Sequence, residues 1–490
     1  MEVVRNPLRR FWGLAVGTRF GTLANWRAAR ATMFLVALGL AGVFASAGLA
    51  QANQPPQILT RVFFLDRQTQ SVKWAELLAG ERPQMTAVKP IAGFPTLDPA
   101  QQEIIGLEVS GGMMVVAVAA RNPAAARGWV LVECGAYEEA HGDHSHWIYP
   151  IAPRIRAMAV DTAQPNPARL LQQSNAFLWT HQGGGFTRLD PAGIAGNATA
   201  DSLRRRAAVH GGGDGAALAA IANVVAFAGG DHAESSEGAR TARVDVTLLK
   251  AAGNDKPLAS LKLGLAPIEQ MATTYNRVFV HGGGKLAWFA VPSRIASDAA
   301  QYPVQPVMLD GNRAEPGSAS MESLGPMSVY GRYVAFGDGV GAEAGFRFID
   351  ASVSAPIVRR VSLNAPDALR PGRIELVRNR RGQPLALVFL EGPSAAGKST
   401  DRLAILELDP NRDGDWADAK VATSIAVGNH AESANHVLSV DADQRRAVYS
   451  NPGDGTVMIF SVDDRQTING FKVGGQPTEV RAVGGRVSNH

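Results

Sequence analysis

Three histidines occur close together in the segment Glu138–Trp147, which has the sequence EEAHGDHSHW. His141, His144 and His146 are two or three residues apart, and Asp143 lies between the first two. Imidazole and carboxylate groups at this spacing on a loop can bind one transition-metal ion. We therefore predict a metal site at these four residues, with a polar loop that is rich in histidine by chance as the alternative.

Two later segments, residues 230–235 and residues 428–433, share the pattern G-[DN]-H-A-E-S. Each has a His and a Glu two positions apart, and His436 follows the second segment. Equivalent positions on different blades of a β-propeller face a common rim or channel. On that architecture, His232, His430 and His436 are further candidate metal ligands. The alternative is a similarity inherited from an internal repeat, without a function.

Two other segments match motifs that bind ligands in other folds. Residues 392–399 fit the P-loop pattern G-x4-G-K-[ST], but the residues that follow alternate like a strand, whereas a P-loop opens a helix. We interpret them as a hairpin loop. Residues 409–415 resemble the start of a calcium loop, but Lys420 stands where its bidentate acid is expected. Calcium is a possible ligand there, and a plain acidic turn is the favoured interpretation.

The elements that must position these residues are short β-type runs, each bounded by turn residues. Residues 113–120, 277–281 and 446–450 are examples. Helical periodicity is scarce, and no crossover helices separate the runs, which argues against an α/β fold. The 52 glycines and 28 prolines also indicate frequent turns. The sequence predicts an all-β fold.

Residues 437–463 resemble one blade of a bacterial propeller repeat of the YVTN type, with a tight hairpin predicted at Gly453-Asp454-Gly455. Units of strand, histidine, Gly-rich hairpin and strand recur at residues 177–187 and 278–289. Such units cannot bury both faces alone, so they must stack into a ring. We predict a single β-propeller domain over residues 51–490, with seven blades favoured and eight as the alternative. A pair of β-sandwiches is the competing architecture.

The first 50 residues have the features of an export signal. They contain six arginines and one glutamate, an apolar run from Met33 to Phe44, and then small residues. The run is short for a membrane span of roughly 20 residues. We predict that residues 1–50 are a signal peptide and that the mature protein is periplasmic and outside the membrane. An uncleaved membrane anchor is the alternative.

Composition excludes several classes of function. The net charge of +4 comes from the first 50 residues, so the rest of the chain is close to neutral and lacks the basic face of a nucleic-acid binder. Cys134 is the only cysteine, which rules out an internal disulfide and a C-x-x-C-H haem site. Neither a G-x-S-x-G elbow nor an H-E-x-x-H helix occurs. We therefore expect a protein that is not an enzyme.

The segment EEAHGDHSHW resembles the E-D-H-G-D-H-x-H signature of a family of periplasmic zinc metallochaperones. Those proteins are secreted β-propellers that deliver zinc to the solute-binding protein of a zinc ABC importer. The resemblance is strong around residues 133–147 and 437–463, within a wider stretch of residues 60–480. It implies zinc as the metal and such a solute-binding protein as the partner.

The same resemblance adds one candidate ligand and lacks another part of the family pattern. His210 matches one histidine of a family His-His-Gly motif, and Val209 replaces the other. A family Cys…His-Gly-Glu element has no counterpart near residues 265–274.

Three functions are therefore in competition. The first is a periplasmic propeller that binds zinc and passes it to a transporter component. Its zinc affinity should fall as the pH drops through about 6.5, because a protonated imidazole cannot bind a metal. The second is a scaffold for protein partners without a metal. The third is a metal-dependent hydrolase with the ion in the propeller channel.

Overall fold

In the computed structural model the chain divides into two units, Met1–Pro56 and Gln57–His490. The structure describes residues 57–485 except residues 81, 142–143, 174–175, 183–185, 192–216, 222–223, 231–243, 251–257, 266–267, 293–301, 310–323, 367 and 394–398. Among the described residues, no helix combines the length and the apolar character needed to cross a membrane.

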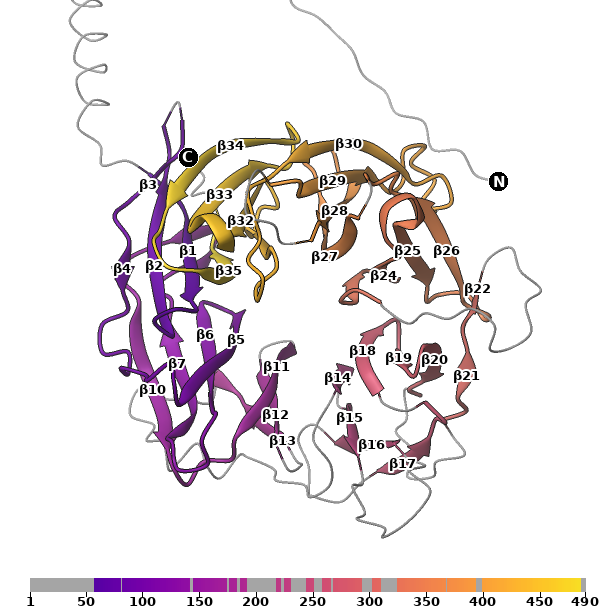
Figure 1. Cartoon of the computed structure of the whole chain (residues 1–490), viewed down its shortest axis with the longest axis horizontal. Helices are drawn as coiled ribbons and strands as arrows, with labels where there is room; N and C mark the ends of the chain where they lie inside the picture. Colours follow the sequence, from indigo (N-terminus) through magenta and orange to yellow (C-terminus); the bar gives the residue numbers. More distant parts are fainter. Residues whose placement is uncertain are drawn as a thin grey trace, which may run out of the picture. The chain divides into compact units, whose positions relative to one another are not determined.

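The described residues of the second unit form eight antiparallel sheets of three to five strands, with one short parallel pair in the sixth. Figure 1 shows them around a ring. The strands of the first four sheets, in chain order, are β1 (Ile58–Asp66), β2 (Ser71–Leu78), β3 (Gln84–Met85) and β4 (Lys89–Pro90); β5 (Gln102–Ser110), β6 (Met113–Ala120), β7 (Arg127–Glu133) and β10 (Arg154–Asp161); β11 (Pro167–Gln173), β12 (Ala176–His181) and β13 (Phe186–Leu189); and β14 (Ala217–Ile221), β15 (Val224–Gly230), β16 (Val244–Lys250) and β17 (Ala259–Lys262).

The other four sheets follow the same plan. Their strands are β18 (Ile268–Thr274), β19 (Arg277–Gly282), β20 (Lys285–Ala290) and β21 (Gln305–Pro306); β22 (Met308–Leu309), β23 (Ser328–Tyr330), β24 (Tyr333–Asp338), β25 (Gly345–Asp350) and β26 (Ile357–Ser362); β27 (Arg370–Arg378), β28 (Pro384–Glu391), β29 (Arg402–Glu407) and β30 (Lys420–Ala426); and β31 (Leu438–Val440), β32 (Arg446–Asn451), β33 (Thr456–Ser461) and β34 (Gln466–Lys472). Single-turn 3-10 helices among the described residues include η3 (Gly341–Glu343) and η4 (Pro452–Asp454), which lie in connections between strands.

Strand β35 (Pro477–Val483) closes the ring. It pairs antiparallel with β1, from Arg61 opposite Val483 to Leu65 opposite Glu479, so the first sheet contains strands from both ends of the described chain. The predicted all-β propeller is confirmed, and the pair of β-sandwiches is wrong. The eight sheets are counted from hydrogen-bonded strands of the described residues.

The hydrophobic core lies between neighbouring sheets. Phe346 of β25 packs in the same buried cluster as Ala386 of β28 and Leu406 of β29, which belong to the next sheet. Second and third strands are covered by a sheet on each side, which explains continuous apolar runs such as MMVVAVAA in β6. In the segment predicted as one blade, β31, β32 and β33 do share a sheet, and Gly455 allows the tight turn because its φ is 60°.

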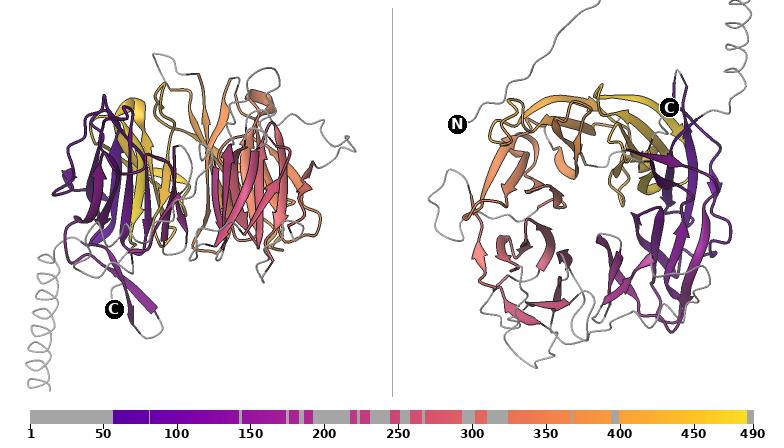
Figure 2. Two further views of the ribbon diagram at one scale, coloured as in Figure 1. Left: turned by 90° about the horizontal axis from the view of Figure 1, so that it is seen from below. Right: turned by 180° about the vertical axis from the view of Figure 1, so that it is seen from behind.

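Connections alternate between the two ends of the ring, because neighbouring strands of a sheet run in opposite directions. The connections β28–β29, β30–β31 and β32–β33 emerge at one end. The β7–β10 and β29–β30 connections emerge at the other end. The β7–β10 connection contains a hairpin of two strands, β8 (Tyr137–His141) and β9 (His144–Ile148), which projects from the body of the ring in Figure 2.

Candidate metal centre

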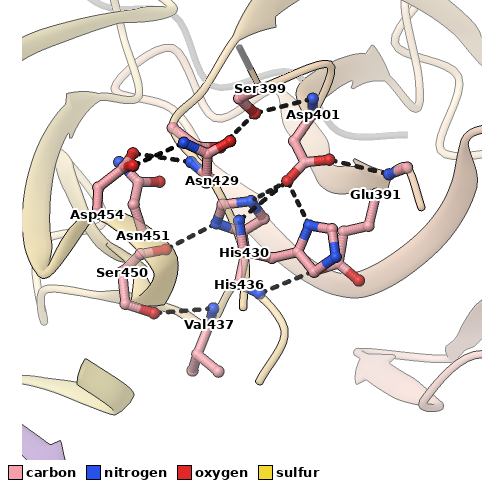
Figure 3. A network of polar contacts seen from close by, with 12 residues as sticks. Glu391, Ser399, Asp401, Asn429, His430, His436, Val437, Ser450, Asn451 and Asp454 are labelled. Carbon is pink, nitrogen blue, oxygen red and sulfur yellow. Dashed lines mark hydrogen bonds and ion pairs between the residues drawn. The ribbon is translucent and has the colours of Figure 1, made fainter. Parts of the chain in front are cut away.

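Three side chains meet where the sheet β27–β30 joins the sheet β31–β34. Asp401 directly precedes β29, and His430 and His436 lie in the connection from β30 to β31. Asp401 Oδ2 lies 2.6 Å from His430 Nδ1 and 3.0 Å from His436 Nε2 (Figure 3). In the part of the chain that the structure describes, this is the only group of at least three His, Cys, Asp or Glu side chains with ligand atoms within 4.8 Å of one another.

Hydrogen bonding determines which nitrogen of His436 faces Asp401. Nδ1 of His436 lies 2.8 Å from the main-chain oxygen of Ser450, which can only accept, so Nδ1 carries a proton. Nε2 then faces the Asp401 carboxylate at 3.0 Å. Two arrangements allow this contact. Either Nε2 also carries a proton and donates it to Asp401, or Nε2 has no proton and a metal cation lies between Nε2 and the carboxylate. A histidine that donates its other N–H to a main-chain carbonyl is typical of metal ligands.

Asp401 is held as a carboxylate anion. Burial alone would raise the pKa of Asp401, but hydrogen bonds from His436, from the Gly392 N–H and from His430 outweigh that effect and hold the pKa well below its usual range. The group therefore offers one negative charge and two imidazoles in a small volume.

A second set of contacts fixes the geometry of this group. Glu391 Oε1 accepts the main-chain N–H of His436 at 2.8 Å. Burial raises the pKa of Glu391 although the nearby imidazoles oppose this shift. The ring of His436 also stacks on Phe389, with 4.8 Å between the ring centroids. Asn429, next to His430, donates from its main-chain and side-chain nitrogens to Asp454 at 2.8 and 2.7 Å. His436 is thus positioned by β28, and the residue next to His430 is held by η4.

Exposure and ligand number decide what this group can do. The side chains of His436, Asp401 and His430 are 0%, 3% and 11% exposed, so solvent reaches the site on the His430 side. Two nitrogens and one oxygen suit zinc and neighbouring transition metals. Tetrahedral zinc needs its ligand atoms about 3.3 Å apart, so a small outward movement of the imidazoles is enough. Three protein ligands leave the fourth position to water or to an incoming ligand.

The structure brings together only some of the predicted ligands. His430 and His436 meet at Asp401, whereas the segment from His141 to His146 lies at the other end of the ring, in the β8–β9 hairpin. The register of that hairpin pairs His141 with His144 and Glu139 with His146. Asp143, His210 and His232 lie outside the described residues.

Of the two G-[DN]-H-A-E-S segments, the structure describes residues 428–433 but only Gly230 of the first, so their joint role in metal binding stays a prediction. Gly230 ends β15, the second strand of its sheet, whereas His430 follows β30, the last strand of its sheet. The second segment thus lies in a connection between two blades.

Sequence reasoning missed Asp401 and Glu391. They lie on either side of the segment that matches the P-loop pattern. That segment joins β28 to β29, as expected for a hairpin loop. Ser399 of that segment donates to the main-chain oxygen of Gly428, and the Asp401 N–H donates to Ser399. Acids beside loops are common in sequences, so the sequence does not single out Asp401 or Glu391. What distinguishes them is that they lie next to the connection that carries His430 and His436, and this is seen only in the tertiary structure.

Fold and cluster together define a β-propeller with an Asp-His-His group at one end of its ring. No protein-family model and no curated protein matches the chain. Among solved structures, it is similar to AztD of Citrobacter koseri, with a TM-score of 0.58 and 13% identity over 88% of this chain and 100% of that one. An apo structure of the same protein has a TM-score of 0.58 and 12% identity.

A second solved structure resembles the chain less closely. It is dihydro-heme d1 dehydrogenase NirN in complex with DHE, with a TM-score of 0.50 and 12% identity over 87% of this chain and 76% of that chain. At these identities the comparisons show the shared propeller fold.

Proposed function

We propose that this chain is a periplasmic β-propeller that binds zinc and passes it to the solute-binding protein of an ABC importer. One observation carries the proposal: a single carboxylate oxygen of Asp401 is shared by two imidazole nitrogens, one of them fixed as Nε2 by a main-chain carbonyl. A site with three protein ligands and one open position suits a metal that must leave again, because a closed structural zinc site has four protein ligands.

The other parts of the proposal rest on the sequence. The segment from His141 to His146 resembles the metal-binding signature of periplasmic zinc metallochaperones, and we propose that it captures zinc at the opposite end of the ring from Asp401. Residues 1–50 would act as the export signal, with residues 51–490 as the mature domain. The likeness in fold to AztD of Citrobacter koseri is consistent with this assignment.

The test is zinc binding by the purified mature protein, measured by elemental analysis and by titration of the metal-free form against a chelating dye. Asp401→Asn keeps the size of the side chain but removes its charge. We expect it to weaken binding at this site by about 100-fold or more, since loss even of the groups that orient ligands costs 10–100-fold. His430→Ala and His436→Ala should have similar effects.

Glu432→Gln is the matched control. Glu432 is exposed in the same connection and is outside the Asp-His-His group, so its variant should bind zinc like the wild type. Transfer is then measured by mixing the zinc-loaded protein with a metal-free solute-binding protein. Unchanged affinity in the Asp401→Asn variant would remove this site from the proposal, and absence of any zinc binding would favour a metal-independent scaffold.

A metal-dependent hydrolase is the second candidate, because three ligands plus an open position are also the arrangement of catalytic zinc. Buried Glu391 beside the site is a carboxylate that could serve as a base. Assays with ester, phosphate and lactone substrates in the presence of zinc distinguish the two functions. Turnover that disappears in the Asp401→Asn variant would support the hydrolase.

A further inference from the structure

The β29–β30 connection has a composition that the proposed zinc function does not use. Within residues 409–418 it contains four aspartates and one asparagine, with Gly414 at the sixth position. Asp409, Asn411 and Asp413 occupy the first, third and fifth positions, which supply side-chain oxygens in calcium loops. Lys420 stands at the twelfth position, where calcium loops have an acidic ligand, so the sequence alone argues against a calcium site.

The structure shows that a different acid turns toward this loop. Asp418, at the tenth position, reaches back so that its Oδ2 accepts the N–H of Asn411 at 3.2 Å. From the other side, Asp409 Oδ2 accepts the N–H of Gly414 at 3.0 Å. Both carboxylates therefore point into the loop, and Asp418 lies where it can replace the twelfth-position acid of calcium loops.

Two carboxylate oxygens in this loop are buried without a hydrogen-bond partner. They are Asp409 Oδ1 and Asp418 Oδ1, and the side of the loop that holds Asp409 is well covered, since that residue is only 8% exposed. A buried oxygen that carries charge and lacks a donor is costly, and most such atoms in proteins have a partner. A bound cation satisfies both oxygens at once.

We propose that Asp409, Asn411, Asp413 and Asp418 form a calcium site, separate from the proposed zinc site and at the opposite end of the ring. Only oxygen donors are present, and a flexible loop of carboxylate, amide and main-chain oxygens suits Ca²⁺ better than transition metals. The acids of this loop are less tightly gathered than Asp401 and its histidines. Calcium would draw them together, because it removes the repulsion between like charges.

The positive charges around the loop do not compete for the two buried oxygens. Arg359 pairs with Asp415 at 3.1 Å, and Arg332 donates to the main-chain oxygen of Gly414 at 2.9 Å. Arg412, the cation within the loop, is exposed.

The site has a structural consequence for the ring. Trp416, in the middle of the loop, stacks on Tyr333 of the neighbouring blade with 3.8 Å between ring centroids, and the Tyr333 hydroxyl donates to the Gly414 oxygen at 2.9 Å. An ion that rigidifies the loop therefore also stabilises the contact between β24 and the blade β27–β30.

The test uses Ca²⁺ alone on the metal-free mature protein. Calorimetric titration should give one Ca²⁺ per chain, with a dissociation constant between about 10 µM and 1 mM, and the Tm should rise with calcium concentration. Tb³⁺ is an independent probe, because Trp416 in the loop can sensitise its luminescence. Asp409→Asn and Asp418→Asn should each abolish calcium binding and the rise in Tm.

Asp415→Asn is the matched control, because the Asp415 carboxylate is outside the proposed ligand set and is bound by Arg359 and by the Ala417 N–H; this variant should still bind calcium. The Asp401→Asn variant should also bind calcium normally, so failure of the zinc proposal leaves this one intact. Without calcium, Asp409→Asn should be as stable as the wild type or more so, because it removes the charge from a buried carboxylate whose Oδ1 has no donor. Absence of calcium binding at millimolar concentration, or binding that survives both Asn variants, would overturn the proposal.

Discussion

A main-chain carbonyl decides the chemistry of His436. Because Ser450 offers only an acceptor, Nδ1 of His436 is the protonated nitrogen and Nε2 is left for Asp401. Main-chain contacts also anchor Asp401, whose carboxylate accepts the N–H groups of Gly392 and His430. At the scale of single residues, the cluster is thus organised by backbone groups that no pattern of residue types encodes.

Asp441 gives a prediction about pH at the same scale. Burial raises its pKa to about 6, although the N–H groups of Arg446 and Arg445 bind its Oδ1 and oppose the shift. An unfolded Asp has a pKa of about 3.9, so between about pH 4 and pH 6 the folded protein holds a proton that the unfolded chain has lost. This group therefore makes the protein less stable as the pH rises through that window, by up to about 3 kcal/mol.

Asp441→Asn should remove this dependence, since the amide oxygen can still accept both N–H groups. We expect the variant to gain stability relative to the wild type between pH 4.5 and pH 7, measured by urea unfolding at both values. Asp464→Asn, in the exposed turn after β33, controls for the loss of a carboxylate. Equal differences between Asp441→Asn and wild type at the two pH values would contradict the prediction.

At the scale of elements, one buried arginine holds the base of the β8–β9 hairpin. Arg61 of β1 is 3% exposed, and its Nη1 donates to the oxygens of Cys134 and Ile151, which precede and follow the hairpin, at 2.9 and 2.5 Å. Its other nitrogens bind Glu76 at 2.9 and 3.1 Å. The hairpin that carries His141, His144 and His146 is thereby tied to the ring at both ends.

Arg61→Met should loosen the hairpin and destabilise the protein by about 3 kcal/mol, because it leaves Glu76, the buried Cys134 carbonyl and the partly buried Ile151 carbonyl without this partner. Hydrogen exchange of residues 137–148 should become faster. Arg154→Met is the control, since the Arg154 side chain is 54% exposed and forms an ion pair with Glu133; an exposed pair of this kind should contribute little to stability. Slow exchange in the hairpin of the Arg61→Met variant would disprove the tie.

At the scale of the whole propeller, stability depends on closure by β35. Its buried Val480 and Val483 pack in clusters that join neighbouring blades, and Arg481 binds Glu108 of β5 at 3.3 Å. A chain cut after residue 476 loses the whole of β35 and leaves the edge of β1 unpaired. It should aggregate or unfold without a single cooperative transition, as followed by light scattering and circular dichroism.

A chain cut after residue 485 keeps every pair between β1 and β35 and serves as the control. It should unfold cooperatively and at a Tm close to that of the full chain. If the shorter chain, which lacks β35, behaves in the same way, then closure contributes little and the blades are held by their neighbours alone.

Local patterns in the sequence determined much of the architecture. Alternating and apolar runs predicted the strands, as in β6, where the predicted and observed bounds agree, and in β32, where they differ by one residue. Turn residues placed the hairpin at Gly455, and the absence of helical periodicity gave the all-β class. These features depend on residues that are neighbours in the chain, so the period of side-chain direction and the allowed φ values are sufficient to predict them.

Only the tertiary structure decided which residues form the candidate metal centre. His430 and His436 were found as histidines, but their partner Asp401 is 29 and 35 residues away and meets them because one blade packs against the next. Similarly, Asp418 completes the β29–β30 loop because the chain turns back there, against the usual spacing of calcium loops. The geometry of the candidate ligands arises from contacts between neighbouring blades. Packing and ring closure determine how the blades contact each other, and the spacing of residue types along the chain does not predict this.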